Sequence, residues 1–215
     1  MSFAIIIPAQ EKNRYHDQGD LAPFGQTTLL EWKIAQCKEF VELSQINICS
    51  DSEVIKEIAQ KEGINYIKRK TGLSYKEMIF KSIEAVDVKD IILINTTSPF
   101  IGSKIYKNMY DEYKSKKLNS LISVEKKNEY IFFEEKKFNF NDNFTPRENV
   151  KPIYIATNGC YIFNRDFAVN NEKFLSSNPS LFPVDSFTAT EIKDIKDYKI
   201  AREMITMYFQ EDLDV

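Results

Sequence analysis

The sequence has few of the residues that mark disordered, fibrous or disulfide-stabilised chains. Its 215 residues include only 6 glycines, 7 prolines, 3 cysteines and 1 histidine. So little glycine and proline excludes a low-complexity or collagen-like chain. Cys37, Cys49 and Cys160 are odd in number and show no CxxC spacing, so the sequence predicts neither a disulfide framework nor a zinc site.

Long hydrophobic runs and an excess of positive charge are also missing. Lys and Arg number 29 and Asp and Glu 32, which gives a formal net charge of −3. A chain with this balance has no broad cationic field for nucleic-acid backbones. The longest apolar runs have the length of strands rather than of bilayer-spanning helices. We therefore expect a cytoplasmic protein with no signal peptide, no membrane span and no nucleic-acid partner.

Short apolar runs alternate with amphipathic stretches over the first two-thirds of the chain, which is the pattern of βα units on a parallel sheet. The expected strands are residues 3–8, 45–49, 65–68, 90–94 and 119–124. Two of their apolar runs, 5–7 and 91–94, do not alternate with polar residues, which is typical of neighbouring central strands buried on both faces. The sequence predicts a single domain over residues 1–215, a three-layer α/β/α sandwich around a mostly parallel sheet.

The periodicity changes within residues 126–157. Residues 130–140 are rich in aromatic side chains and predict a β-hairpin with its turn near 135–137. The hairpin is too aromatic and too exposed to lie inside the sheet, so we expect an arm that projects and packs against a second subunit. The aromatic residues of the hairpin, together with Lys136 and Lys137, are also compatible with binding of single-stranded nucleic acid by stacking, but the net charge favours a dimer interface.

Two loops are expected to form the site, because ligands of open parallel sheets bind beyond the carboxyl ends of the strands. The first loop, residues 8–25, is long compared with usual βα loops of roughly two to six residues, and it carries Lys12 and Arg14. The second, residues 95–99, brings small polar side chains out of a buried strand, and Arg69 follows the third strand. Neither GxGxxG nor GxxxxGK[ST] is present, so phosphate binding would depend on lysine and arginine side chains.

Six segments occur in an order that resembles one known family. They are Ile6-Ile7-Pro8-Ala9, Cys49-Ser50-Asp51-Ser52, Lys68-Arg69, Asn95-Thr96-Thr97-Ser98-Pro99-Phe100, Thr157-Asn158-Gly159-Cys160-Tyr161-Ile162-Phe163 and Ile195-Lys196-Asp197-Tyr198-Lys199-Ile200-Ala201-Arg202-Glu203. Together they resemble the acylneuraminate cytidylyltransferases, the CMP-sialic acid synthetase group of Rossmann-like nucleotidyltransferases. The resemblance covers nearly the whole chain. It implies transfer of CMP from CTP to a small-molecule acceptor, Mg²⁺ as cofactor, release of pyrophosphate, and a homodimer formed through the inserted arm at 126–157.

On the nucleotide side, the resemblance implies binding by residues at the ends of three strands. They are Pro8, Ala9, Gln10, Lys12, Arg14, Arg69 and Asn95. Family members have P-A-R-x-G-S-K in the first loop, whereas here Gln10 takes the arginine position and the Gly-Ser pair is missing. Lys12 and Arg14 are therefore expected to supply the missing charge and to act at the reaction centre.

On the acceptor side, the resemblance implies binding by Asn95, Thr96, Asn158 and Tyr161. The family carries two metal-binding aspartates as D-x-D before the last helix. Here the corresponding segment is Glu191-Ile192-Lys193, so Glu191 and Asp194 are the expected metal ligands.

Lys193 changes the expected chemistry. A sugar hydroxyl needs a base or a metal to ionise it, whereas a phosphate is already an anion and needs only charge neutralisation. A catalytic Lys193 favours a phosphate acceptor, as in methylerythritol phosphate cytidylyltransferase, where an N-I-K segment stands in a comparable place. Three functions stay open. The leading one is transfer of CMP to a nonulosonic-acid-like sugar for surface polysaccharide synthesis. The alternatives are transfer of CMP to a sugar or polyol phosphate, and nucleotide binding without turnover.

Several of these residues also have a plainer structural explanation. A lone loop histidine such as His16 is usually just solvated. The polar run 95–98 is compatible with a helix cap, and Asn158-Gly159 with an ordinary turn. Glu191 and Asp194 precede a helix, where acidic residues favour the helix dipole without any metal.

Overall fold

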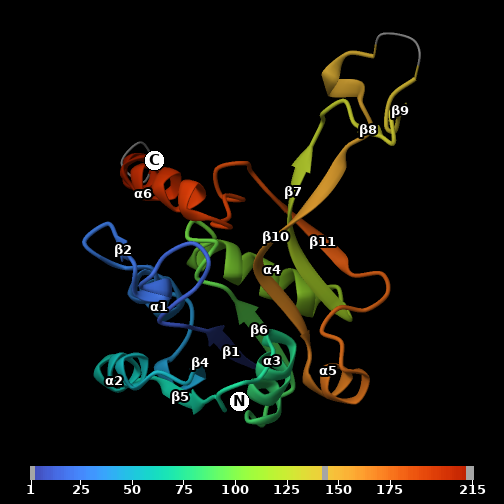
Figure 1. Ribbon diagram of the computed structural model, residues 1–215. Coiled ribbons are helices and arrows are strands. Elements are labelled where there is room, and N and C mark those ends of the chain that lie inside the picture. The colour runs from blue at the N-terminus through green and yellow to red at the C-terminus, as the bar shows by residue number, and fades with distance from the viewer. Residues whose placement is uncertain (1–2, 142–144, 212–215) are drawn as a thin grey trace.

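A seven-stranded, mostly parallel sheet forms the centre of the molecule (Figure 1). The computed structural model describes residues 3–141 and 145–211; residues 142–144 of the predicted arm, 1–2 and 212–215 lie outside the described residues. The strand order is β11 (Ser180–Val184), β7 (Ser120–Lys127), β10 (Ile153–Asn164), β6 (Asp90–Ile94), β1 (Phe3–Pro8), β4 (Ile46–Ser50) and β5 (Asn65–Lys68). Strand β10 runs antiparallel to both of its neighbours, and the other pairings described in this sheet are parallel.

The two runs of consecutive apolar residues form adjacent central strands, as predicted. In the parallel register of β1 and β6, Ile5 lies opposite Ile92. Side chains of a strand point alternately to its two faces, so Ile5 and Ile7 enter one core while Ala4 and Ile6 enter the other. Burial on both faces explains the uninterrupted apolar runs at residues 5–7 and 91–94.

Helices cover both faces of the sheet and confirm the three-layer α/β/α sandwich. One face is packed by α1 (Leu29–Lys38), α2 (Glu53–Glu62) and α4 (Ser103–Ser115), and the other by α3 (Tyr75–Glu84) and α5 (Arg165–Asn171). A third cluster joins α6 (Ile195–Glu211) to α1 and to the small sheet of β2 (Pro23–Phe24) and β3 (Thr27–Thr28). The 3-10 turns are Gly19–Leu21, Leu43–Gln45 and Arg147–Asn149. Within the described residues, no helix combines the length and apolar character needed to cross a bilayer.

The start of α3 is fixed by a capping box. Ser74 Oγ accepts a hydrogen bond from the backbone N–H of Glu77 at 3.3 Å, and the Glu77 carboxylate accepts one from the backbone N–H of Ser74 at 2.8 Å. This reciprocal pair satisfies two N–H groups that the helix itself leaves unpaired. Tyr75 is thereby held as the first residue of α3, at the carboxyl edge of the sheet.

Strands β7 and β10 continue beyond the sheet into an arm that ends in the small hairpin of β8 (Phe132–Phe133) and β9 (Lys136–Lys137) (Figure 1). The turn lies slightly earlier than predicted. Glu134 and Glu135 form it with positive φ angles of 46° and 64°, because Lys136 and Lys137 pair with Phe133 and Phe132. Phe132, Phe133 and Phe138 are 62%, 63% and 65% exposed, which is unusual for large apolar side chains in one segment.

Candidate functional site

A cavity of about 520 Å³ opens where β1 and β6 end. Its walls include residues from both predicted loops and from two later segments of the chain. Seven residues predicted from the sequence line it: Pro8, Gln10, Arg14, Asn95, Thr96, Asn158 and Glu191. The structure therefore brings the first loop, the β6 loop, β10 and the segment before α6 to one place, as expected for the carboxyl edge of a parallel sheet.

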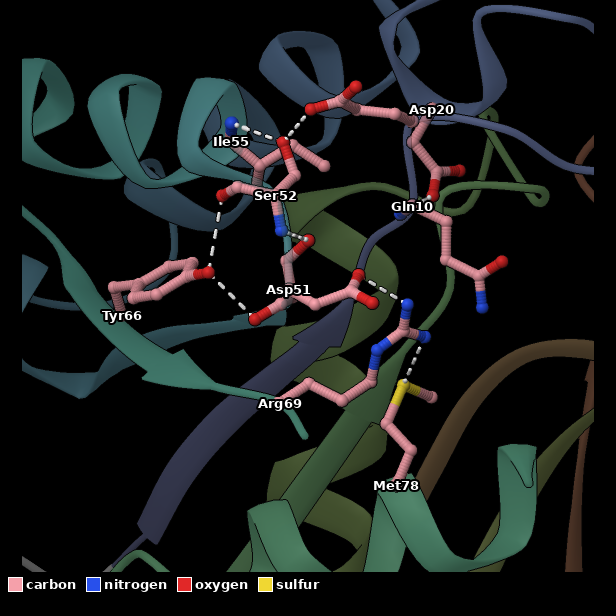
Figure 2. Close-up of polar contacts among 10 residues, drawn as sticks. Gln10, Asp20, Asp51, Ser52, Ile55, Tyr66, Arg69 and Met78 are labelled. Carbon is pink, nitrogen blue, oxygen red and sulfur yellow. Dashed lines mark hydrogen bonds and ion pairs between the residues drawn. The ribbon is translucent and has the colours of Figure 1, made fainter. Parts of the chain in front are cut away.

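A second hollow of about 410 Å³ adjoins the first, because Gln10 lines both. It contains Lys12 and Arg69, the two other predicted cations. The Arg69 guanidinium forms an ion pair with Asp51 and contacts Met78 Sδ at 3.4 Å (Figure 2). The predicted nucleotide-binding cations thus lie around two connected hollows, with Arg14 in one and Lys12 and Arg69 in the other.

Acidic residues share the second hollow with these cations. Glu11 accepts a hydrogen bond from Ser52 Oγ, and the same oxygen of Ser52 caps α2 by accepting from Ile55 N–H at 3.0 Å. The Gln10 side-chain amide is oriented so that its nitrogen donates to the carbonyl oxygen of Lys12 and its oxygen accepts a hydrogen bond from Arg69 Nη1 at 3.1 Å. Arg69 is therefore held between Asp51 and Gln10 rather than extended into solvent.

Asp20 is the most deeply buried carboxylate of the cavity, and sequence reasoning missed it. Its side chain accepts hydrogen bonds from the backbone N–H of Gln10 at 2.6 Å, from Tyr15 Oη at 2.5 Å and from Thr96 Oγ1 at 2.5 Å. Burial raises the pKa of Asp20, while the three donors favour its charged form. Because Gln10 and Tyr15 belong to the first loop and Thr96 to the second, Asp20 ties the two loops together.

A chain of amide and hydroxyl groups forms the opposite wall. Tyr75 Oη donates to Asn95 Oδ1 at 3.1 Å, and Asn95 Nδ2 donates to the carbonyl oxygen of Asn158 at 2.7 Å. Asn158 has a left-handed φ of 53°, and its Oδ1 accepts from Tyr161 Oη at 2.7 Å. Burial, and then the charge of Asp20, raises the pKa of Tyr75 to about 12. Tyr75 was also missed by sequence reasoning, because nothing in its local pattern distinguishes it from a surface residue at the start of a helix.

Glu191 closes this wall near the start of α6. Its Oε1 accepts a hydrogen bond from Asn158 Nδ2 at 3.3 Å. Burial raises the pKa of Glu191, while Asn158, Lys193 and Arg14 act in the opposite direction. Lys193 Nζ lies 3.9 Å from Glu191 Oε2, with 61% of the lysine side chain exposed, so Lys193 stands at the rim next to Glu191.

Asp194 lies outside the residues that line the cavity. Its Oδ1 accepts hydrogen bonds from the backbone N–H groups of Lys196 at 2.7 Å and Asp197 at 3.0 Å. These bonds lower the pKa of Asp194. The structure places this carboxylate as the cap of α6, and its predicted role as a metal ligand stays a prediction.

Three other residues named from the sequence stand behind or beside the walls. Ala9 is fully buried and donates its backbone N–H to the carbonyl of Cys49 at 3.0 Å. Tyr161 contributes to the cavity wall indirectly, by donating a hydrogen bond to the side chain of Asn158. His16 is outside the cavity lining, and its Nδ1 accepts from the backbone N–H of Gln18 at 3.1 Å.

The carboxylates of the cavity have the donor chemistry for a shared magnesium site. In the described part of the chain, no group of three or more His, Cys, Asp or Glu side chains is placed to hold a metal by itself. Mg²⁺ is commonly held by one or two carboxylates together with substrate phosphates. Asp20 already accepts three hydrogen bonds, so Glu191 is the carboxylate that fits a site completed by phosphate oxygens.

Comparison with known proteins identifies the family. A family model described as cytidylyltransferase matches residues 4–209. The chain belongs to the cytidylyltransferase family. Family membership makes this protein a nucleotidyltransferase that uses CTP, in agreement with the resemblance stated above.

Two relatives of this cytidylyltransferase come from Campylobacter. The chain is 26% identical over 196 residues to the post-translational flagellin modification protein B of Campylobacter coli, covering 82% of this chain and 83% of the relative. It is 34% identical over 65 residues to the CMP-N,N'-diacetyllegionaminic acid synthase of Campylobacter jejuni, covering 30% of this chain and 28% of the relative.

The fold of this cytidylyltransferase matches a solved structure over almost its full length. A CMP:2-keto-3-deoxy-manno-octonic acid synthetase complexed with CTP superposes with a TM-score of 0.76, covering 96% of this chain and 99% of that one. The sequence identity is 12%, so this likeness establishes the fold and leaves the acceptor to be argued from the site.

Proposed function

We propose that this cytidylyltransferase transfers CMP from CTP to an acidic, nonulosonic-acid-like sugar and releases pyrophosphate, as a step in surface polysaccharide synthesis. The observation that carries the proposal is a single cavity lined by Arg14 together with the amides of Asn95 and Asn158 and the carboxylate of Glu191. The names of the two Campylobacter relatives, a flagellin modification protein and a CMP-diacetyllegionaminic acid synthase, support a sugar acid as the acceptor class.

The reaction exchanges one phosphorus–oxygen bond for another. An acceptor oxygen attacks the α-phosphorus of CTP, the bond from that phosphorus to the bridging oxygen breaks, and pyrophosphate leaves with the bonding electrons. The catalyst has to position the two partners and to neutralise the negative charge of the leaving group. Arg14, Lys12 and Arg69 are the cations of the two connected hollows, and we assign them to the phosphates and the nucleotide.

The opposite wall is assigned to the acceptor. Asn95, Thr96 and Asn158 carry amide and hydroxyl groups suited to the hydroxyl groups of a sugar, and Tyr161 fixes the Asn158 amide at 2.7 Å. Glu191 would hold Mg²⁺ together with phosphate oxygens. When bound, the metal would supply charge stabilisation and would lower the pKa of an acceptor hydroxyl.

A phosphate acceptor is the second candidate function. Lys193 and Arg14 both lie close enough to Glu191 to influence its pKa. A phosphate group bound beside Glu191 would gain from these two cations, which supports transfer to a sugar or polyol phosphate and a CDP-linked product. The Glu191 carboxylate would repel a phosphate dianion more strongly than the single negative charge of a sugar acid, and for this reason we place the sugar acid first.

The proposal includes a homodimer in the cytoplasm. The three exposed phenylalanines lie in or next to the β8–β9 hairpin, which belongs to the arm that projects from the sheet (Figure 1). Contact with a second copy would remove this apolar surface from water. A cytoplasmic enzyme would have direct access to CTP.

Measurement of pyrophosphate release tests the proposal. The purified enzyme is supplied with each of four nucleoside triphosphates and Mg²⁺, and with a panel of nonulosonic acids, sugar phosphates and polyol phosphates. We expect release only with CTP and a nonulosonic acid. Release only with phosphorylated acceptors would select the second candidate. CTP that raises the melting temperature without any release would favour nucleotide binding without turnover.

A further inference from the structure

Lys33 places in the core a buried amino group that the proposed reaction does not use. Its side chain is fully buried within α1 and the core, and it forms no ion pair among the described residues. Instead, Nζ lies 2.7 Å from Gln36 Oε1, 2.9 Å and 2.8 Å from the carbonyl oxygens of Ser98 and Ile101, and 2.8 Å from Tyr106 Oη. Burying a charge without a counter-ion is costly, so a gain elsewhere is expected.

The groups that Lys33 binds belong to the loop that follows β6. Two neighbouring side chains of α1 bind the same loop: Trp32 Nε1 and Gln36 Nε2 donate to the carbonyl oxygen of Pro99 at 2.7 Å and 2.9 Å. We call Trp32, Lys33 and Gln36 the α1 clamp. Together the clamp holds the carbonyl groups of Ser98, Pro99 and Ile101, on a stretch with no helix or strand of its own.

This loop supports the cavity from behind. It begins with Asn95 and Thr96, which line the cavity. Ser98 Oγ donates to the carbonyl of Thr157 at 2.9 Å. A Cβ on Gly159 would lie only 2.3 Å from Ile101 Cδ1 and 2.9 Å from Ser98 Cβ. The segment of β10 that carries Asn158 therefore rests directly on the clamped loop.

An ammonium group is chemically suited to this position. It offers three donors from a single atom, and hydrogen bonds from a charged donor are roughly twice as strong as neutral ones. Burial lowers the pKa of Lys33 to about 7. The four acceptors around Nζ act against this effect, because a neutral amine has fewer N–H groups to share among them.

We propose that Lys33 is a positioning residue for cytidylyl transfer, holding the loop of residues 95–101 so that Asn95, Thr96 and Asn158 keep their places in the wall of the cavity. The inference deepens the proposed function and rests on its placement of substrates in this cavity. Lys33 itself touches no substrate; it acts through the loop that it binds.

The test compares Lys33→Met with Lys114→Met. Lys114 Nζ binds Asp90 Oδ2 at 2.9 Å; Asp90 is the first residue of β6, the strand that leads into the loop bound by Lys33. Methionine keeps most of the side-chain volume and removes the donors in both variants. Lys114→Met therefore measures how much stability is lost when a lysine contact at the opposite end of β6 is removed.

Three measurements are made on each purified variant: the free energy of unfolding, amide hydrogen exchange, and kcat and KM for CTP well below the unfolding midpoint. For Lys33→Met we expect at least tenfold faster exchange at residues 96–98, 100–101 and 158–160. We also expect kcat to fall about 10- to 100-fold, with KM for CTP changed less than about threefold. Lys114→Met is expected to leave kcat and exchange in these segments unchanged.

Equal behaviour of the two variants, or unchanged exchange in Lys33→Met, would overturn the inference. If Lys33→Met fails to fold, Gln36→Met takes its place, because it removes one donor and one acceptor of the clamp and should show the same pattern with smaller amplitude. A wild-type enzyme that releases no pyrophosphate with any acceptor would refute the proposed function alone. Exchange at residues 158–160, which needs no acceptor, would then decide the role of Lys33.

Discussion

Replacing Asp20 with alanine removes the acceptor that three donors share. Two of them, the hydroxyl groups of Tyr15 and Thr96, belong to side chains that are only 4% and 3% exposed. Leaving a buried donor unpaired costs about 1–3 kcal/mol, so the two buried hydroxyl groups give a cost of about 2–6 kcal/mol, to which the partly buried N–H of Gln10 adds. The removal of a buried carboxylate, whose pKa is raised by burial, offsets part of this cost. We expect Asp20→Ala to lower the free energy of unfolding by about 3 kcal/mol or more.

Asp20→Asn provides the matched comparison. Its carbonyl oxygen can keep the bonds from Tyr15 and Thr96, which both reach Oδ1, while its amide nitrogen would face the backbone N–H of Gln10. The expected loss is about 1–2 kcal/mol. Urea denaturation followed by circular dichroism measures the free energy of unfolding of both variants. The comparison requires that the dependence of this free energy on urea concentration has the same slope in each. The reasoning would be refuted if Asp20→Ala lay within about 0.5 kcal/mol of wild type, or if the asparagine variant were the less stable of the two.

Three further predictions concern pH, catalysis and assembly. Because burial raises the pKa of Asp20 above its ordinary 3.8, the folded state takes up this proton first as the pH falls. The free energy of unfolding of wild type minus that of Asp20→Asn should then grow from about pH 7 toward pH 4 in urea titrations. A difference that stays constant with pH would contradict this prediction. Arg14→Ala should lower kcat/KM for CTP about 100-fold or more in the pyrophosphate assay, whereas His16→Ala in the same loop should change it less than about threefold; similar losses would argue against a role for Arg14 on the phosphates. A Phe132→Ser, Phe133→Ser double variant should shift the mass in light scattering from dimer to monomer while leaving the circular dichroism spectrum of the domain unchanged, and an unchanged mass would exclude the hairpin as the interface.

The layered fold and the location of the site were largely determined by the sequence. Burial on both faces of β1 and β6 leaves uninterrupted runs of aliphatic residues, and the predicted neighbouring strands are paired in the structure. The carboxyl ends of such strands meet at one edge, so Arg14 and Asn95 could be assigned to one cavity before any contact was known. The sequence did not show that Lys12 and Arg14 line different hollows, because the path of a long loop cannot be predicted from its local sequence.

Only the tertiary structure distinguished Asp20, Lys33 and Asp194 from the other charged residues. Asp20 and Lys33 acquire their roles from partners far along the chain: Thr96 lies 76 positions from Asp20, and the carbonyl groups of Ser98 and Ile101 lie 65 and 68 positions from Lys33. An acidic residue before a helix suits a metal and a helix cap equally well. The backbone bonds of Asp194 place it at the cap of α6. The role of a polar side chain depends on how deeply it is buried and on which groups surround it, and both are set by long-range packing rather than by neighbours in the sequence.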